Sequence, residues 1–266
     1  MVCEKIECSL VVIGGVGYNK KEDERRGENL KEDSRYIKTK YGDVYLEIEK
    51  IEGEKIAMIP RHFGERHVPP HKINYKALVS AAATFNAPVL SINSVGCMKN
   101  MPVGSFLIPN DFVDMTKTRE NTFFNEKTVH TDMSDPYCKS VRDVLKNILD
   151  EKNIEYNEGI YVATEGPRFE TKAEIRFYKN IGDAVGMTGV PEVVLAKEAG
   201  LCYASLCLIT NYAAGIEENK ILTIKEVTDE VEKSRKNIRE IIPLLAKRLK
   251  NKNNCNCKKS LEENEI

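Results

Sequence analysis

Basic side chains gather just after a short apolar run near residue 60, in the stretch IPRHFGERHVPPHKINY. This stretch holds three of the four histidines of the chain, and its basic residues are Arg61, His62, Arg66, His67, His71 and Lys72. Guanidinium and imidazole groups hold oxyanions by charge-assisted hydrogen bonds, so the cluster is typical of a phosphate or other oxyanion site. A surface salt-bridge patch is the alternative. A metal site is not expected here, because carboxylates or thiolates at a fitting spacing are missing.

A glycine turn follows the first apolar run, in VVIGGVGYNK. Backbone amides in such a turn can approach an anion closely. The turn is only a fragment of the dinucleotide-binding fingerprint, because Lys20 stands where the third glycine belongs and a charged segment follows instead of a helix. A nicotinamide-dependent enzyme is therefore not expected.

An asparagine ends a buried-looking strand in LCLITNYAAG, where mostly apolar residues lead into Asn211. Ligands of α/β sheets bind at the carboxyl ends of the strands, so a side chain at this position can read a bound molecule. The alternative is that Asn211 only caps a turn, which is common for asparagine at a strand end.

Strand-like and helix-like segments alternate along the chain. We expect strands at 9–15, 44–51, 55–60, 87–95, 159–166, 183–189 and 202–211. We expect helices at 74–85, 136–150, 171–179, 191–199 and 223–249, the last with a capping box at Thr223 and a bend at Pro243. The charged segment 19–38 is predicted to be a solvated loop. This order predicts an α/β fold with a largely parallel sheet covered by helices.

Length and charge narrow the possible functions. The 266 residues suit one large domain, predicted over 1–250 and followed by a polar tail over 251–266. A net charge of -1 gives no overall field for nucleic acid or anionic lipid. The first apolar run is too short for a signal peptide or a membrane span, so we expect a soluble, cytoplasmic protein without nucleic-acid or membrane partners.

Eight cysteines in an intracellular chain are expected to be reduced thiols. Cys255 and Cys257 lie close together in the polar tail. Zinc sites usually space paired cysteines by two to four residues and no histidine pair follows, so no metal is expected. A structural disulfide of a heat-adapted protein and an inert pair in a disordered tail both stay open.

Several quoted stretches resemble one family. RHFGERHVPPHKINY, EGPRFETKAE, GMTGVPEVVLAKEAGLCYASL and ITNYAAG look like the nucleoside phosphorylases, which include 5'-methylthioadenosine phosphorylases and trimeric purine nucleoside phosphorylases. The likeness extends roughly from Leu10 to Glu230. It implies a single α/β domain with a mixed, partly barrel-like sheet flanked by helices, and a homotrimer or a dimer of trimers. It also implies cleavage of a purine nucleoside by inorganic phosphate, with no metal or organic cofactor.

The resemblance assigns phosphate binding to Gly15, Val16, Arg61, His62, Ser94 and Thr188. A bound phosphate stabilises the oxocarbenium-like ribosyl cation and supplies the nucleophile. Val16 is a departure, because relatives usually carry Ser or Thr there. The glycine turn is therefore expected to act through its backbone amides or to contribute less.

The resemblance assigns purine binding to Val95, Gly96, Phe169, Glu170 and Asn211, with Glu170 and Asn211 as the catalytic pair and Met187 under the ribose. Methylthioadenosine phosphorylases typically have Ser and Asp where this chain has Glu170 and Asn211. A glutamate carboxylate can accept the N1–H of a 6-oxopurine, and the Asn amide can donate to N7 or O6. The alternative for Met187 and Phe169 is ordinary core packing.

The expected 5' side of the sugar pocket is apolar. A cap at Thr223 places Ile224 and Val227 on one face of the last helix, and Ile224 stands where related enzymes that accept a 5'-hydroxyl tend to have histidine. A methylthio group suits this wall, and His130 matches a residue that relatives insert into the neighbouring subunit's pocket. A plain amphipathic stripe is the alternative for Ile224 and Val227.

The sequence thus predicts a 6-oxopurine nucleoside phosphorylase of purine salvage. The expected substrate is 5'-methylthioinosine, with inosine and guanosine also accepted. The alternatives are an ordinary purine nucleoside phosphorylase, a 5'-methylthioadenosine phosphorylase and a non-enzymatic nucleoside-binding module. The Arg61 and His62 pair argues against the last of these.

Overall fold

The computed structural model describes residues 7–15, 34–64, 67–250 and 255–260. In this part of the chain nine strands form one sheet: β1 (Leu10–Gly14), β2 (Ser34–Thr39), β3 (Gly42–Ile51), β4 (Glu54–Pro60), β5 (Val89–Cys97), β6 (Phe106–Met115), β7 (Tyr156–Thr164), β8 (Ala184–Gly186) and β9 (Tyr203–Tyr212). The helices of this part are α2 (Tyr75–Ala83), α3 (Lys139–Glu151), α4 (Lys172–Tyr178), α5 (Gly189–Glu198) and α6 (Ile224–Leu249). Two short 3₁₀ turns span Pro70–Lys72 and Cys257–Lys259.

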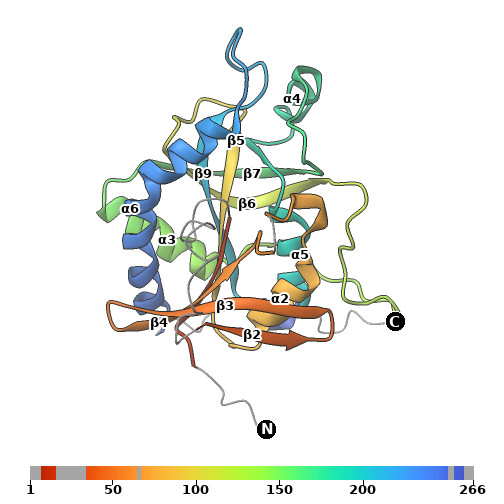
Figure 1. Cartoon of the computed structure of the whole chain (residues 1–266), viewed down its shortest axis with the longest axis vertical. Helices are drawn as coiled ribbons and strands as arrows, with labels where there is room; N and C mark the ends of the chain where they lie inside the picture. Colours follow the sequence, from red (N-terminus) through yellow and green to blue (C-terminus); the bar gives the residue numbers. More distant parts are fainter. Residues whose placement is uncertain (1–6, 16–33, 65–66, 251–254, 261–266) are drawn as a thin grey trace.

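Half of the sheet closes on itself. The strand order is β2-β3-β4-β1-β5-β8-β7-β6-β9, and β9 also pairs with β5. The strands β5, β8, β7, β6 and β9 therefore form a closed ring, while β1 to β4 extend the sheet away from it (Figure 1). Parallel pairs such as β1/β5 and β5/β9 occur beside antiparallel ones such as β6/β9. The prediction of a mixed, partly barrel-like α/β sheet is confirmed.

The core lies on both sides of the central strands. β1 is buried along its whole length, LVVIG, as a strand between two parallel neighbours must be. Its alternate side chains enter two apolar clusters, one packed under α2 and α5 and the other under α3 and α6 (Figure 1). This packing fixes β5 and β9 side by side, so their carboxyl ends meet at one edge of the ring.

Two strands were not predicted from the sequence. β2 lies partly in the segment 19–38 that was expected to be a loop, and the rest of that segment lies outside the described residues. β2 pairs only with β3, so its charged side chains stay at the solvent-facing edge and give no apolar run. β6 contains Pro109, which cannot donate to a sheet ladder, and the register with β7 shifts directly after it.

The last helix follows its predicted bounds. The Thr223 hydroxyl accepts from the backbone N–H of Glu226 at 3.3 Å, which caps α6, and Pro243 lies inside the helix. Helix α6 is amphipathic: most of its apolar residues are buried on one face, which packs against α3 and the sheet. None of the described helices has the length and apolar composition needed to cross a bilayer.

Candidate active site

A cavity opens at the carboxyl ends of β5 and β9, beside the turn that follows β8. It is lined by Gly15, Arg61, His62, His67, Pro70, Ser94, Val95, Gly96, Pro167, Phe169, Glu170, Val185, Gly186, Met187, Thr188, Thr210, Asn211, Ala213, Leu222, Ile224 and Val227. The register pairs Gly96 of β5 with Asn211 of β9, so both strands deliver side chains to one place. The fold thus brings distant segments to the edge where α/β sheets bind ligands.

The site residues predicted from the sequence gather at this cavity. Each of them that the structure describes lines it, apart from His130. His130 lies on an exposed stretch of the loop between β6 and α3 and is not part of this chain's cavity lining. Val16 lies outside the described residues. The shared location supports a common site, while the role of each residue stays a prediction.

Arg61 is held rigidly by a buried carboxylate. Its Nε donates to Glu192 at 2.8 Å, and its Nη2 donates to Glu192 at 3.1 Å and to the Ser91 hydroxyl at 2.7 Å. Both charged side chains are buried, at 3% and 0% exposed. Burial opposes the charged form, but the charge and hydrogen bonds of Glu192 raise the pKa of Arg61 above its ordinary value. Arg61 is therefore a fixed, permanent cation.

One N–H group of the Arg61 guanidinium remains available to a ligand. Nη1 donates to the carbonyl oxygen of Ile92 at 3.0 Å, and it carries a second hydrogen for which the described residues offer no further acceptor. A Cβ on Gly15 would lie 3.1 Å from this Nη1. Glycine at this position thus leaves open the space that an anion would need in order to reach the guanidinium.

Thr188 is joined to Arg61 through a buried polar network. The Thr188 hydroxyl donates to Asn93 Oδ1 at 2.9 Å, and Asn93 Nδ2 donates to the Ser91 hydroxyl at 3.0 Å. Ser91 is the same hydroxyl that accepts from Arg61. A phosphate that takes the Thr188 hydrogen must displace the bond to Asn93, but the hydroxyl oxygen is already positioned.

His62 is a neutral imidazole with a defined tautomer. Its Nδ1 lies 2.7 Å from the carbonyl oxygen of Val68, which can only accept, so Nδ1 carries the proton. Burial lowers the pKa of His62 to about 3, against the raising effect of the Val68 hydrogen bond, and Arg61 lowers it further. Nε2 is consequently an acceptor, suited to a protonated oxygen of a phosphate monoanion.

The opposite end of the cavity carries an amide and a carboxyl group. The Oδ1 of Asn211 accepts from the Thr210 hydroxyl at 2.9 Å, and its Nδ2 donates to the Tyr212 carbonyl at 3.0 Å. These bonds fix the amide so that Nδ2 has one hydrogen left. Glu170 accepts from the Thr164 hydroxyl at 2.6 Å, and burial raises the pKa of its carboxyl group.

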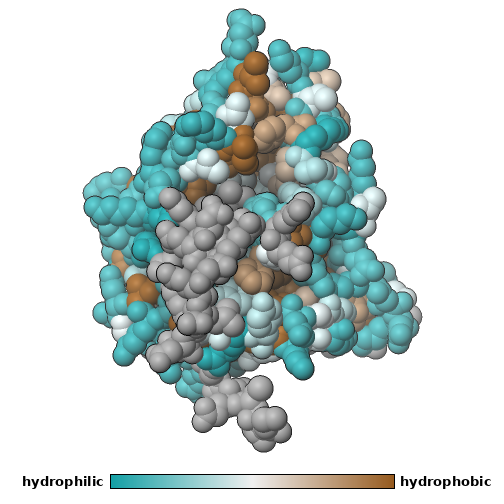
Figure 2. Space-filling model, in the orientation of Figure 1, coloured by the Kyte–Doolittle hydropathy of each residue, from teal (hydrophilic) through white to brown (hydrophobic). Residues whose placement is uncertain are grey.

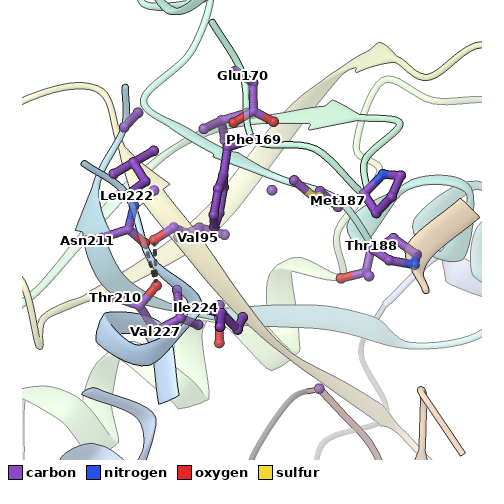
Figure 3. A pocket seen from close by; sticks show the side chains of 18 of the residues that line it. Val95, Phe169, Glu170, Met187, Thr188, Thr210, Asn211, Leu222, Ile224 and Val227 are labelled. Atoms are coloured by element: carbon purple, nitrogen blue, oxygen red, sulfur yellow. Dashed lines mark hydrogen bonds between the residues drawn. The ribbon is translucent and has the colours of Figure 1, made fainter. Parts of the chain in front are cut away.

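Figure 3 shows how these groups are distributed. Glu170, Phe169, Val95 and Asn211 lie on one side of the cavity and Thr188 on the other, with Met187 between them. The arrangement separates an end with an aromatic ring, a carboxyl group and an amide from an end with the Thr188 hydroxyl. A ligand with a flat, polar ring system at one end and a neighbouring phosphate at the other would match both ends of the cavity.

The remaining wall of the cavity is hydrocarbon. Leu222, Ile224 and Val227 form it, and Ile224 and Val227 lie together below the other labelled side chains in Figure 3. Val227 is buried, whereas Ile224 is 61% exposed in the single chain. Figure 2 shows apolar surface gathered in the upper part of this face, where the segment before α6 and helix α4 lie in Figure 1. The cavity wall at Ile224 is therefore apolar and exposed to solvent in the single chain.

The sequence did not indicate the residues that hold the side chains of Arg61 and Asn211 in place. Glu192 and Ser91 fix Arg61, and Thr210 fixes Asn211. The signal for Glu192 was a single carboxylate inside the apolar run GVPEVVLA, since a buried charge must find a partner. The hydroxyl partners had no such signal, because Ser and Thr are common in buried strands.

Comparisons with known proteins agree with this geometry. Residues 9–246 match the model of the phosphorylase superfamily. The chain is 45% identical to a probable S-methyl-5'-thioinosine phosphorylase of Methanosarcina acetivorans over 94% of this chain and 93% of that one. It is 40% identical to a probable 6-oxopurine nucleoside phosphorylase of Dictyoglomus turgidum over 96% and 97% of the two chains. Among solved structures, the methylthioadenosine phosphorylase of Schistosoma mansoni in complex with adenine matches with a TM-score of 0.85 at 26% identity, covering 97% of this chain and 96% of that one.

Proposed function

The chain belongs to the phosphorylase superfamily, and on that premise we propose that it cleaves 6-oxopurine nucleosides with phosphate and prefers 5'-methylthioinosine. The reaction converts 5'-methylthioinosine and phosphate to hypoxanthine and 5-methylthioribose 1-phosphate, so the protein is a pentosyltransferase that serves purine salvage. Inosine and guanosine are further substrates. The chemistry needs no metal and no organic cofactor.

The phosphate end supplies the nucleophile and the main electrostatic stabilisation. As the bond from C1' to N9 breaks, positive charge develops on the ribosyl ring, and a phosphate held beside C1' stabilises it before attacking. Arg61 offers its free Nη1 hydrogen, Thr188 its hydroxyl and Gly15 an unobstructed approach. His62 accepts a hydrogen from a protonated phosphate oxygen. Ser94 contributes its backbone amide.

The observation that carries the base assignment is the pairing of an ionisable carboxyl with a donor-oriented amide. Glu170 as a carboxylate accepts the N1–H of hypoxanthine or guanine, and the free Nδ2 hydrogen of Asn211 donates to N7 or O6. Phe169 packs on the purine face, beside Val95 and Gly96. Adenine has no hydrogen on N1, so its N1 and the Glu170 carboxylate would be two acceptors facing each other. Each polar group left unpaired in this way costs roughly 1–3 kcal/mol of binding free energy.

The solved methylthioadenosine phosphorylases share the fold, and two side chains account for the proposed difference in base. The relatives with 40% and 45% identity are named for 6-oxopurine or methylthioinosine substrates, in agreement with Glu170 and Asn211. A shared fold at 26% identity does not fix the base, because specificity resides in the polar groups that meet the purine edge.

The ribose end is proposed to be completed by a second subunit. Met187 lies under the ribose, and Leu222, Ile224 and Val227 receive the 5'-methylthio group. Ile224 is too exposed in one chain to form a closed wall. A homotrimer, or a dimer of trimers, would cover it and bring His130 of a neighbour to the same pocket. The seven described cysteines are free, which suits a cytoplasmic protein.

Replacing Ile224 by histidine tests the 5' assignment. We expect the wild type to favour 5'-methylthioinosine over inosine by roughly 5–30-fold in kcat/KM, from burial of the methyl and sulfur at about 0.8 kcal/mol per CH2-sized group. Ile224→His should narrow this gap by improving inosine, because the imidazole supplies a hydrogen bond for the 5'-hydroxyl.

The measurement is kcat/KM for both nucleosides in both proteins. Ile221→His is the matched control, because Ile221 lies on the same segment, is 82% exposed and does not line the cavity. Thermal melts by circular dichroism exclude unfolding of the start of α6. A wild type that prefers inosine, or a variant that weakens both substrates equally, would favour an ordinary purine nucleoside phosphorylase.

A further inference from the structure

Four cysteines from distant parts of the chain meet at one place. Cys138 precedes α3, Cys202 precedes β9, and Cys255 and Cys257 belong to the segment after α6. Their Sγ atoms all lie within 4.8 Å of one another, and those of Cys202 and Cys255 are 3.1 Å apart. All four are free thiols in the structure.

The arrangement has the dimensions of a tetrahedral cage. Four thiolates at about 2.3 Å from a central Zn²⁺ ion lie about 3.8 Å from one another. The 3.1 Å between the Sγ atoms of Cys202 and Cys255, and the 4.8 Å limit within which all four Sγ atoms lie, are compatible with that value. Soft thiolate donors in a tetrahedral set select Zn²⁺ or iron over Mg²⁺ and Ca²⁺.

We propose that Cys138, Cys202, Cys255 and Cys257 form a tetrathiolate site for one divalent metal ion of this class, with Zn²⁺ as the first choice. Binding releases the thiol protons to solvent and leaves the ion held by four thiolates. The spacing of the pair in CNC is too short for a usual zinc knuckle, which is why no metal was expected from the sequence. Folding brings Cys138 and Cys202 to this pair and completes a set of four sulfur ligands.

The surroundings favour thiolates and a fixed geometry. Cys138 occupies the N-cap position of α3, where the positive end of a 13-residue helix stabilises negative charge. Its backbone N–H donates to the Tyr203 carbonyl at 2.7 Å, which ties it to the start of β9. Lys258 and Lys259 follow Cys257 directly and add positive charge near a site with a net charge of about -2.

The segment that carries two of the ligands is anchored independently of any ion. The Ser260 hydroxyl donates to the Lys197 carbonyl at 2.8 Å, and the Asp132 N–H donates to the Ser260 carbonyl at 3.3 Å. A surface hollow lined in part by Cys138, Cys255 and Cys257 gives an ion a path from solvent. The site is thus both preformed and accessible, as metal uptake requires.

The position of the cluster indicates a structural role. Cys202 precedes the first residue of β9, whereas Asn211 lies near its carboxyl end, so roughly 30 Å of extended chain separates the cluster from the nucleoside cavity. A bound ion would cross-link the C-terminal segment to α3 and β9. It would stabilise the fold without taking part in phosphorolysis.

The test is to purify the full chain anaerobically with a reductant and measure its metal content. We expect about one zinc or iron per chain by elemental analysis, which distinguishes the two ions. Removing the metal with a chelator and adding Co²⁺ should give the visible bands and the sulfur-to-metal charge-transfer band of a tetrahedral cobalt tetrathiolate. This reconstitution uses the wild-type fold, so it does not depend on the stability of a variant.

Two variants and a control assign the ligands. Cys202→Ser and Cys257→Ser should each reduce bound metal to near zero and lower Tm by roughly 5–10 °C, with phosphorolysis at moderate temperature retained. Cys8→Ser should keep the full metal content, because Cys8 lies outside the cluster. Reduced wild type that binds neither zinc, iron nor Co²⁺ would overturn the proposal, as would four thiols that form two disulfides in the purified protein and take up no ion after reduction.

Discussion

Arg61→Ala is expected to lower kcat/KM for phosphorolysis by roughly 10²–10³-fold, the usual cost of removing a positioned electrostatic group from a developing charge. Arg61 offers a fixed cation and one free N–H to the anion end of the cavity. The proposed purine contacts, Glu170 and Asn211, lie across the cavity from Thr188, the other proposed phosphate ligand (Figure 3), so nucleoside binding should remain measurable. The loss should therefore appear in kcat and in KM for phosphate rather than in nucleoside affinity.

The variant also leaves Glu192 buried without its cation, so stability must be measured alongside turnover. Arg61→Ala combined with Glu192→Gln removes the unpaired charge and separates folding from catalysis. Arg248→Ala is the matched control, since Arg248 forms an ion pair with Glu151 away from the cavity. Unchanged turnover at saturating phosphate in a folded Arg61→Ala protein would exclude Arg61 as a phosphate ligand.

Asn211→Asp is expected to shift the preference between bases by roughly 10–100-fold in the ratio of kcat/KM values, on the scale of one or two unpaired polar groups. The aspartate loses the Nδ2 hydrogen that is proposed to donate to N7 or O6, and its added oxygen can accept from a 6-amino group. Turnover of 6-oxopurines should fall while relative use of 6-aminopurines rises. The switch should be partial, because Glu170 still opposes the N1 of adenine.

The experiment compares 5'-methylthioinosine with 5'-methylthioadenosine in wild type and variant. Asn157→Asp, an exposed amide at the far end of β7, controls for the added charge. If the ratio of the two kcat/KM values is the same in wild type and variant, Asn211 is a turn residue and does not form hydrogen bonds with the purine.

Most of the fold was predictable because the buried strands are apolar runs. The apolar runs of β1 and β9 predict both strands, and the Thr-Ile-Lys-Glu pattern predicts the start of α6, where the Thr223 side chain caps the helix. β2 escaped prediction because an edge strand needs no apolar run, and β6 because Pro109 interrupts its pattern. The closure of the ring through β5 and β9 came from family resemblance, since local periodicity carries no information on which strands pair.

The candidate site likewise contains residues that local sequence patterns indicate and residues that they do not. Arg61 and Asn211 stood out because a cation cluster after a strand and an amide at a strand end are local patterns. The Glu192 and Ser91 support of Arg61, and the meeting of Cys138 with Cys257, join segments far apart in the chain. Only tertiary packing brings such groups together, so spacing along the sequence could not reveal them.

The most direct test is base release from 5'-methylthioinosine by the purified protein, with and without phosphate, beside the same assay on 5'-methylthioadenosine. We expect hypoxanthine and 5-methylthioribose 1-phosphate only when phosphate is present. We also expect kcat/KM for the inosine compound to exceed that for the adenosine compound by at least about 30-fold, from the two polar groups that adenine leaves unpaired. Base release that does not depend on phosphate, or a faster reaction with the adenosine compound, would contradict the proposed function.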